Sequence, residues 1–177
     1  LLGVRANIKA TNCEATEAGS YTFLGLLGGS YAFNHCTFTS YVSYSTRNEG
    51  HFGLTNTLRD GNGNLLRTFP LACDMDNSIV NGPLDDEIEI DNSSLSSFAF
   101  AGDANILTLK FDRPLPALSN FYNVNPMFID FRSSNYQLDT LSPAQDKGIV
   151  SAPIISTDVL GTARDAAPDI GAYERLD

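Results

Sequence analysis

Basic side chains are scarce in this sequence. Eleven Lys and Arg stand against 21 Asp and Glu, which gives a formal net charge of −10. Nucleic-acid backbones and anionic membrane surfaces are bound through clustered Lys and Arg, and the basic residues here are spread along the chain. The composition argues against nucleic acid and anionic membranes as partners. It is compatible with a neutral glycan, a peptide or another protein.

Long hydrophobic runs are absent as well. No apolar stretch reaches the roughly 18 residues that a bilayer-spanning helix needs, so we expect no membrane-spanning segment in this chain. The first residues, Leu1 to Arg5, lack the basic region and the cleavage pattern of a signal peptide. We interpret the N-terminus as a cut inside a longer protein, so that a secretion signal or a surface anchor would lie upstream.

Cysteine is rare, and its pattern predicts no disulfide framework. Cys13, Cys36 and Cys73 are odd in number, and no two of them form a C-x-x-C pair. Each sits in a strand-like setting, so we interpret them as buried free thiols that pack as small hydrophobes, with a disulfide or metal role as the alternative. No cofactor is expected, because Gly25 to Gly29 lacks both the P-loop and the dinucleotide pattern.

Helical periodicity is nearly missing too. No long window places apolar residues at the spacing of a helix face. Short β-prone runs recur instead, separated by Gly, Asn, Asp and Ser, and this predicts an all-β fold. The predicted strands are Val4 to Ala10, Tyr21 to Leu24, Tyr31 to Thr39, Asn77 to Val80, Ile88 to Ile90, Phe98 to Ala101 and Ile106 to Phe111.

A weak internal repeat indicates how these strands are arranged. Asn12-Cys13-Glu14-Ala15 is echoed by His35-Cys36-Thr37-Phe38, and further copies begin near Asp76 and Asp103. A period in the twenties favours a solenoid over a sandwich. Asn suits its turns because it tolerates the left-handed conformation and stacks into ladders. We therefore predict a right-handed parallel β-helix.

Two stretches interrupt the repeat. A polar region over about 43–69 is expected to be a loop or hairpin inserted between coils, with Thr55 to Leu58 pairing with Leu65 to Phe69. The region 113–177 holds most of the prolines, which cannot donate into a ladder. We expect residues 1–112 to form coils and 113–177 to form the last coil and an irregular C-terminal cap over its open edge, within a single domain.

The last part of the chain resembles a known family. Its motifs are Asn125-Pro126-Met127-Phe128-Ile129-Asp130, then Ser142-Pro143-Ala144-Gln145-Asp146-Lys147-Gly148, and finally Asp169-Ile170-Gly171-Ala172-Tyr173-Glu174. In this order they resemble the C-terminal region of secreted right-handed parallel β-helix proteins of Gram-negative bacteria, many of them grouped as choice-of-anchor Q domain proteins. Gln145 departs from the apolar residue usual there. The resemblance implies a β-helix, export and attachment to the cell surface, as in a lipoprotein, but no activity.

The residues of these closing motifs are expected to act structurally. The glycines suit turns with positive φ, and the aspartates suit bonds from side chain to backbone. Arg164 is expected to pair with Asp169 or Glu174 and to hold the tail on the last coil. The predicted structural residues of the cap are Asp146, Gly148, Gly161, Arg164, Asp169, Gly171 and Glu174.

One region could bind a ligand. Tyr41, Tyr44 and Phe52 near the insertion could form an aromatic platform for sugar rings. Arg47 and His51 lie in the same loop and could assist, or serve a lyase together with Arg59. Packing within the protein is the alternative for all of them.

Other polar constellations are weaker. No nucleophile elbow occurs, and His35 is expected to point outward because Cys36 points inward. Asp74 and Asp76 could form a carboxylate pair. A weak Ca²⁺ candidate lies in the acidic run of Asp85, Asp86, Glu87 and Glu89, although a solvated strand face explains it more simply.

These observations predict a non-catalytic, exported surface protein that binds a glycan or another surface protein. We expect it to be secreted or attached to the outer membrane through an upstream anchor. One alternative is a polysaccharide lyase or glycosidase with its active site mainly in upstream coils. Another is a structural stalk or adhesin segment.

Overall fold

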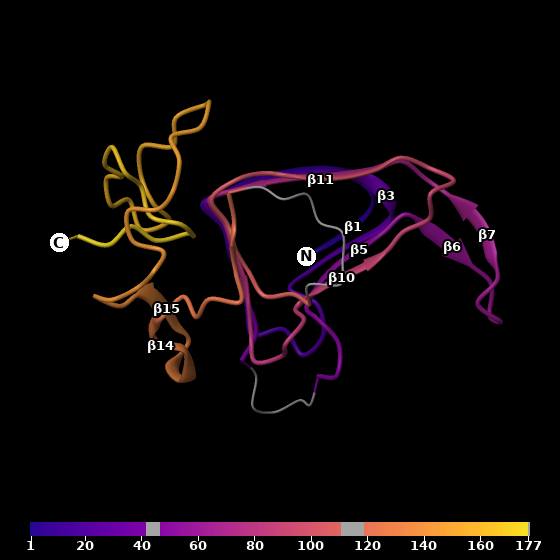
Figure 1. The fold of residues 1–177 in the computed structure, drawn as a ribbon, viewed down its shortest axis with the longest axis horizontal. Coiled ribbons are helices and arrows are strands. Elements are labelled where there is room, and N and C mark those ends of the chain that lie inside the picture. The colour runs from indigo at the N-terminus through magenta and orange to yellow at the C-terminus, as the bar shows by residue number, and fades with distance from the viewer. Residues whose placement is uncertain (42–46, 111–118, 177) are drawn as a thin grey trace.

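A computed structural model describes residues 1–41, 47–110 and 119–176 (Figure 1). The expected all-β class is confirmed, since the only helix in these residues is a short 3-10 turn, η1 (Phe131–Ser133). No helix in the described ranges is long and apolar enough to cross a membrane. The strands form two main sheets whose pairings are all parallel. The first contains β1 (Leu2–Thr11), β3 (Phe23–Asn34), β5 (Phe52–Thr55), β8 (Leu71–Asp76), β10 (Ile88–Asp91) and β11 (Phe98–Ala101).

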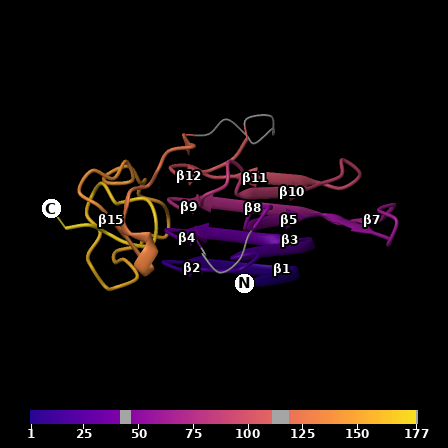
Figure 2. The ribbon, with the colours of Figure 1, turned by 90° about the horizontal axis from the view of Figure 1, so that it is seen from below.

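The second sheet runs beside the first, and the chain alternates between them. It contains β2 (Glu14–Thr16), β4 (Thr37–Thr39), β9 (Ile79–Asn81), β12 (Ile106–Leu107) and β13 (Phe121–Tyr122). The pairs β1/β2, β3/β4, β8/β9 and β11/β12 lie one above another, and we call each pair a layer (Figure 2). Glu14, Thr37, Ile79 and Ile106 are register partners from layer to layer. The sequence repeat therefore places its copies at equivalent positions of successive layers.

The corner between the two sheets explains why the repeat contains Asn. Asn12, His35, Asn77 and Ala104 occupy this corner with φ of 51°, 51°, 49° and 54°. Asn adopts this left-handed region more readily than most residues. The residue after each corner adds a polar ladder, because Cys36 N–H donates to Ser78 Oγ at 3.0 Å and Ser78 N–H donates to the next layer's Asn105 Oδ1 at 2.8 Å. The corners are thereby bonded along the stack.

The main core between the sheets is rich in aromatic rings. Phe23, Phe33, Phe38 and Phe52 are almost fully buried. The Phe23 and Phe33 rings lie 4.9 Å apart at 73°, and the Phe38 and Phe52 rings lie 5.1 Å apart at 74°. Such edge-to-face pairs add about 0.5 to 1.5 kcal/mol each beyond the area they bury. Phe23, Phe33 and Phe38 come from the β3/β4 layer and Phe52 from the next one, so the rings join two layers as well as the two sheets.

The insertion is narrower than the sequence indicated. The expected hairpin is present, with β6 (Thr57–Arg59) antiparallel to β7 (Leu65–Thr68), and it projects from the stack in Figure 1. However, β5 lies inside the expected insertion and belongs to the first sheet, where Phe52 pairs with Phe23 and Ile88. Both β5 and β8 pair with β3. The hairpin is therefore an excursion between two strands of one layer, and residues 42–46 lie outside the described ranges.

We expected the C-terminal segment, residues 123–176, to lie over the last layer, but it does not. It contains the antiparallel pair β14 (Phe128–Asp130) and β15 (Asn135–Leu138), and most of the rest is irregular. Figure 2 shows it beside β2, β4, β9 and β12, along the side of the stack. It reaches the first layer, where the hydroxyl groups of Tyr136 and Tyr173 donate to Glu17 and Glu14.

The second sheet explains this lateral position. In β9, Val80 faces the main core, whereas Ile79 packs into a second cluster together with residues of the C-terminal segment. In β12, Leu107 and Ile106 divide in the same way. Alternate side chains of a strand face opposite sides of its sheet, so this sheet is apolar on both faces and needs a cover. Phe128, Tyr136, Leu138, Ala144 and Ile170 of the C-terminal segment provide that cover.

Candidate functional site

A buried ion pair lies where the loops before β5 and before β10 meet. The Glu87 carboxylate accepts hydrogen bonds from both terminal nitrogens of Arg47, at 2.9 and 3.1 Å. The side chains are 6% and 0% exposed. Arg47 also donates to the Ser40 carbonyl at 3.1 Å, and Leu84 N–H donates to Glu87 Oε1 at 2.9 Å. A bidentate pair with these extra bonds fixes the two loops relative to each other.

His51 lies beside this pair and is fully buried. Its Nε2 is 3.1 Å from the Asn81 carbonyl, and its Nδ1 is 2.6 Å from Thr22 Oγ1. Because a carbonyl only accepts, Nε2 carries the proton and Nδ1 accepts from the Thr22 hydroxyl. The pKa of His51 is lowered to about 4, mainly by burial; the Asn81 carbonyl opposes the shift, and nearby Arg47 contributes to it. His51 is a neutral structural residue with both nitrogens engaged.

This environment predicts a pH-dependent stability. In the unfolded chain His51 binds a proton near its ordinary pKa of 6.5, whereas the folded protein holds it neutral down to about 4. The contribution of neutral His51 to the free energy of unfolding is therefore complete above pH 6.5. It is lost as the pH falls toward 4, at up to about 1.4 kcal/mol per pH unit. Asp169 acts in the opposite direction, because burial raises its pKa to about 6.

Replacing His51 by Gln isolates this contribution. We expect chemical denaturation between pH 7 and 4 to show a shallower loss of unfolding free energy in His51→Gln than in the wild type. Asp169 and His35 are present in both proteins, so they cancel in the comparison. Identical slopes in the two proteins would show that His51 titrates normally in the folded state.

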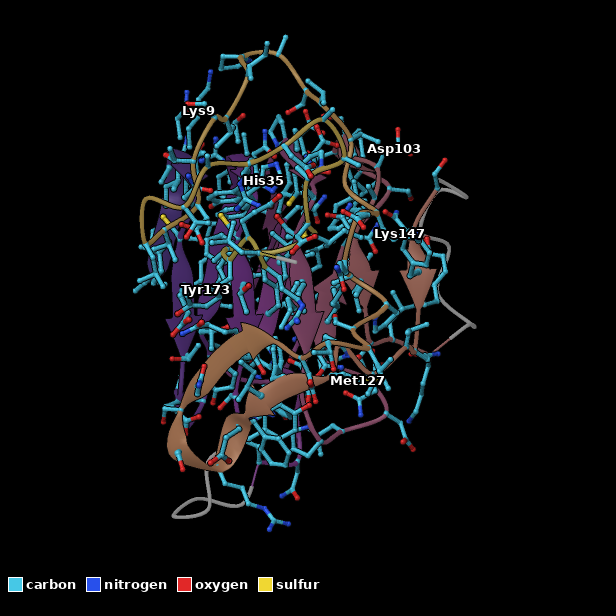
Figure 3. All side chains as sticks on the ribbon, turned by 90° about the vertical axis from the view of Figure 1, so that its left-hand side faces the viewer. Lys9, His35, Asp103, Met127, Lys147 and Tyr173 are labelled. Atoms are coloured by element: carbon cyan, nitrogen blue, oxygen red, sulfur yellow. The ribbon has the colours of Figure 1, made fainter. Side chains whose placement is uncertain are left out.

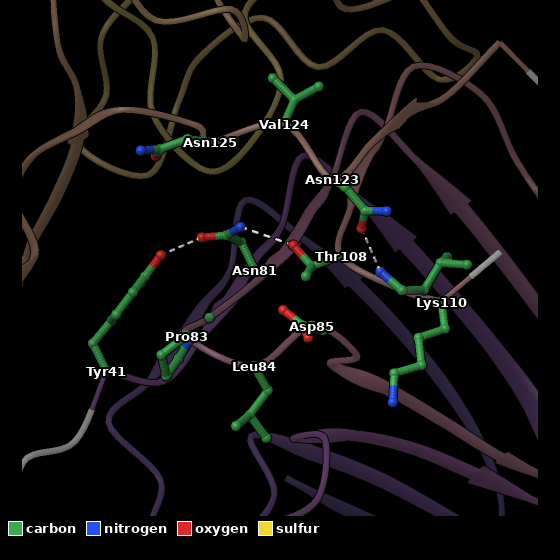
Figure 4. A pocket seen from close by; sticks show the side chains of 12 residues that line it. Tyr41, Asn81, Pro83, Leu84, Asp85, Thr108, Lys110, Asn123, Val124 and Asn125 are labelled. Atoms are coloured by element: carbon green, nitrogen blue, oxygen red, sulfur yellow. Dashed lines mark hydrogen bonds between the residues drawn. The ribbon is translucent and has the colours of Figure 1, made fainter.

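A pocket of about 580 Å³ opens next to these loops (Figure 4). Four separate segments line it: Tyr41, the loop 82–85 with Asn81, the stretch 108–110, and the stretch 123–125. Gly82 separates the pocket from the buried pair, since a Cβ at this position would stand 2.1 Å from Glu87 Oε1. The pocket is thus built on the rigid Arg47–Glu87 pair, and we call it the side pocket.

Amide groups dominate the polar lining of the side pocket. Asn81 accepts from the Tyr41 hydroxyl and donates to Thr108 Oγ1 at 2.9 Å. Asn123 Oδ1 accepts from Leu109 N–H, and Asn125 Oδ1 accepts from Met127 N–H, both at 2.9 Å. These bonds fix the two amide oxygens, and within the described residues they leave the amide nitrogens of Asn123 and Asn125 available as donors. The lining is preorganised for hydrogen bonding.

The side pocket also contains one charge of each sign. Asp85 and Lys110 line it from different loops, and both residues are exposed. The ring of Tyr41 adds an apolar surface, which is backed by Phe131 at a centroid distance of 4.4 Å. The described residues thus offer amides, a hydroxyl, a carboxylate and an ammonium around one cavity.

The aromatic platform expected from the sequence is not formed. Tyr41 lines the side pocket, but Phe52 is 0% exposed in the main core and His51 is 0% exposed beneath it. Arg47 is held in the ion pair with Glu87. Tyr44 lies outside the described residues. The prediction that placed Phe52 in an inserted loop was wrong, because Phe52 begins β5, a strand of the first sheet.

The acidic run does not converge on a cation site. Glu87 is committed to Arg47, and Glu89 accepts from the Tyr21 hydroxyl and from Gly50 N–H, each at 3.0 Å. Asp85 faces the side pocket, while Asp86 precedes the buried pair in the same loop. No group of three or more potential ligands occurs among the described residues. The run is dispersed because Ile88 enters the core and separates its neighbours.

The other polar candidates have structural partners. Arg59 pairs with Asp91 at 3.1 Å on the surface. Asp76 Oδ1 accepts a hydrogen bond from Asp103 N–H of the next layer at 2.8 Å, so it helps to bond the corners of the two layers. His35 is 2% exposed, contrary to the expected outward position in solvent, because the C-terminal segment covers it. Figure 3 shows His35 and Tyr173 on this covered side, among the loops of that segment.

Arg164 ties the C-terminal segment together. It pairs with Glu174 at 2.8 Å, as expected, and donates to the Gly171 carbonyl at 2.9 Å. It also donates to Asn12 Oδ1 at 3.1 Å. Because Asn12 is the corner residue of the first layer, Arg164 holds the tail on the first layer and not on the last.

The cap glycines differ in their roles. Gly171 has φ of +104°, and a Cβ there would stand 2.8 Å from Ile79 Cδ1. Gly161 has φ of +88° in open space, so only its turn requires glycine. Gly148 needs no positive φ. It is required by close approach, since a Cβ would stand 2.6 Å from the Pro168 carbonyl oxygen, and the positive φ falls at Asp146 instead.

The sequence predicted bonds from side chain to backbone for Asp146, Asp158 and Asp169, and the structure shows them for the last two. Asp158 Oδ1 accepts from Leu160 and Thr162 N–H at 2.8 and 2.7 Å. Asp169 accepts from Asp146 N–H and Arg175 N–H, both at 2.8 Å. Asp146 takes part through its backbone donor. These bonds explain how an irregular segment is held in one conformation.

No family model, curated protein or solved structure matches this chain.

Proposed function

We propose that this protein is the C-terminal part of an exported, right-handed parallel β-helix protein of the choice-of-anchor Q type, which binds a neutral glycan in the side pocket without turning it over. It would act at the surface of a Gram-negative bacterium, attached through an upstream anchor. The observation that carries the binding proposal is the preorganised amide lining formed by Asn81, Asn123 and Asn125.

The β-helix proposal is supported by the layers. Each layer contributes to both sheets, although two layers give the first sheet two strands each, β5 with β8 and β10 with β11, and every pairing between layers is parallel. The positive-φ corner recurs in each layer at the same register. A coil that cannot bury its inner face alone is stabilised by stacking in this manner.

A sugar is the ligand class that fits the lining best. Its hydroxyl groups both donate and accept hydrogen bonds, which suits the amides and the Asp85 carboxylate of the lining. The Tyr41 ring adds an apolar surface. A pocket of about 580 Å³ falls in the usual size range of small-molecule sites. The net charge of −10 repels polyanions at long range, so a neutral glycan is favoured over an acidic one.

The number of carboxylates in the lining and the partners of the nearby charged groups favour binding without catalysis. Glycoside hydrolysis needs two carboxylates across the scissile bond, and among the described lining residues only Asp85 carries one. Glu87 and His51 lie nearby but are bound to Arg47 and Thr22 in the interior. A lyase or glycosidase with its site in upstream coils, a partner protein on the surface, and a structural stalk remain the alternatives.

A glycan array with product analysis tests this proposal. We expect the protein to bind at least one neutral polysaccharide and to release no shortened or unsaturated sugars. The double variant Asp85→Ala/Lys110→Ala should bind at least about tenfold more weakly, since hydrogen bonds to charged groups are worth about 1.5 to 3 kcal/mol each. Both side chains are exposed, so the fold should tolerate the change.

A matched variant makes the result specific. Lys9 and Asp74 are an exposed base and acid on the outer face of the first sheet, away from the residues that line the side pocket. Lys9→Ala/Asp74→Ala should bind like the wild type. Equal losses in both double variants would remove the side pocket from the proposal, and product release would favour the enzyme alternative.

A further inference from the structure

Two cysteines occupy equivalent positions in neighbouring layers. Thr11 pairs with Asn34 at the end of one strand, and Glu14 pairs with Thr37 at the start of the next. Between these pairs lie Asn12-Cys13 in the first layer and His35-Cys36 in the second. Asn12 and His35 share a φ of 51°. Cys13 and Cys36 are therefore stacked in register, one directly above the other.

The spacing of this stack suits a disulfide. Neighbouring strands of a sheet lie about 4.8 Å apart, and the Cα atoms of a disulfide lie about 4.4 to 6.8 Å apart. Cys13 Sγ lies 3.4 Å from the Thr11 carbonyl oxygen, and Cys36 Sγ lies 3.5 Å from the equivalent Asn34 carbonyl oxygen. The two thiols thus point the same way from their corners.

The two thiols also reach each other. Cys36 Sγ lies 3.5 Å from the Ala10 carbonyl oxygen, an atom of the first layer. Cys13 is close enough to contribute to the raised pKa of Cys36, behind the larger effect of burial. On its other side Cys36 meets Ser78, whose Oγ accepts its N–H. Cys73 has Tyr31 and Phe100 as its register partners, so it stands apart from this pair.

We propose that Cys13 and Cys36 form a disulfide that joins the first layer to the second when the protein meets a disulfide oxidant. This differs from the sequence-based interpretation of three buried free thiols, because Cys13 is exposed while Cys36 and Cys73 are buried. It is independent of whether the side pocket binds a glycan.

The chemistry proceeds in two exchange steps. The Cys13 thiolate attacks one sulfur of an external disulfide such as oxidised glutathione, which forms a mixed disulfide and releases one thiolate. Cys36 then loses its proton and attacks Cys13 Sγ, which closes the protein disulfide and releases the second thiol. Two protein thiols are oxidised, and one external disulfide is reduced to two thiols.

The environments of the two thiols set the order of these steps. Burial raises the pKa of Cys36 to about 12, so its thiolate is rare and it does not start the reaction. Cys13 is open to solvent and meets the oxidant first. Once Cys13 holds the mixed disulfide, its sulfur is the nearest electrophile to Cys36, and proximity compensates for the scarcity of the thiolate.

The test is oxidation of the 177-residue protein with oxidised glutathione, followed by thiol counting in denaturant. We expect the three free thiols to fall to one, with a mass loss of two hydrogens. Proteolysis after Glu14 and Glu17 separates the two cysteines, so a linked pair of peptides identifies the bridge. The melting temperature should rise by roughly 5 to 10 °C over the reduced protein.

Two variants make the test decisive. Cys73→Ala should still form the bridge and lose both remaining thiols, whereas Cys13→Ser should keep two thiols and show no rise in melting temperature. Three thiols after oxidation would overturn the proposal. A glutathione adduct or an intermolecular dimer at Cys13 with Cys36 still free would overturn it too.

Discussion

Arg47→Met is expected to lower the free energy of unfolding by about 3 to 5 kcal/mol. The substitution keeps most of the side-chain volume but removes the guanidinium that binds Glu87 at 2.9 and 3.1 Å. Glu87 is 0% exposed, so its carboxylate would remain buried without its charge partner. The loss is therefore much larger than that of a hydrogen bond on the surface. Urea denaturation at pH 7 measures it.

The surface pair Arg59–Asp91 provides the control for this prediction. Its side chains are 42% and 48% exposed, and its closest atoms are 3.1 Å apart. Arg59→Met should cost about 1 kcal/mol or less, since water replaces the lost partner. If Arg47→Met costs no more than Arg59→Met, the Glu87 carboxylate is either hydrated or protonated in the folded protein, and the side pocket lacks the rigid base described above.

Phe52→Ala is expected to lower the free energy of unfolding by about 3 to 5 kcal/mol as well. Phe52 is the first residue of β5 and is fully buried, with the rings of Phe23 and Phe38 at 4.9 and 5.1 Å. Truncation removes these contacts and leaves a cavity that the neighbouring layers cannot fill without moving. The same denaturation experiment measures the change.

Phe131→Ala serves as the matched aromatic control. Phe131 is 37% exposed, and the centroid of its ring lies 4.4 Å from that of Tyr41. Its removal should therefore lower the free energy of unfolding by only about 1 kcal/mol. The comparison also separates two roles for Phe52. A stable Phe52→Ala protein that loses glycan binding would support the aromatic platform that the sequence suggested, and would contradict the buried position of this ring.

The repeat could be predicted from the sequence because its cause is local. A corner with positive φ favours Asn, and the alternation of inward and outward residues follows from the strand itself. Asn12 and Asn77 therefore mark the same position of different layers, and the registers Glu14–Thr37 and Thr37–Ile79 follow from them. The all-β class and the hairpin between β6 and β7 were readable for the same reason.

The lateral position of the C-terminal segment could not be predicted in this way. It depends on Ile79 and Ile106, which face away from the main core. When a strand is apolar on both faces, its alternating pattern does not tell which segment of the chain covers each face. β5 was missed because its four residues, Phe52–Thr55, stand between a polar loop and a Gly/Asn-rich hairpin. So short a run carries little periodic signal.

The side pocket lay beyond sequence reasoning for a related cause. Its residues come from four segments that meet only when the layers stack and the C-terminal segment turns back along them. Asn123 and Asn125 are ordinary turn residues in the sequence, and no spacing connects them with Asn81 or Lys110. Tyr41 was named as a ligand residue for its ring, and it lines the pocket with a ring that Phe131 supports from behind.

We propose that a neutral glycan binds in the side pocket and is released unchanged. The most direct test of this proposal is an NMR titration of the isotopically labelled protein with the best oligosaccharide from the array. We expect the side-chain amide signals of Asn81, Asn123 and Asn125 to shift together with the backbone signals of 82–85 and 108–110, while the sugar signals show no new products. Shifts confined to other surfaces, or the appearance of cleaved sugar, would contradict it.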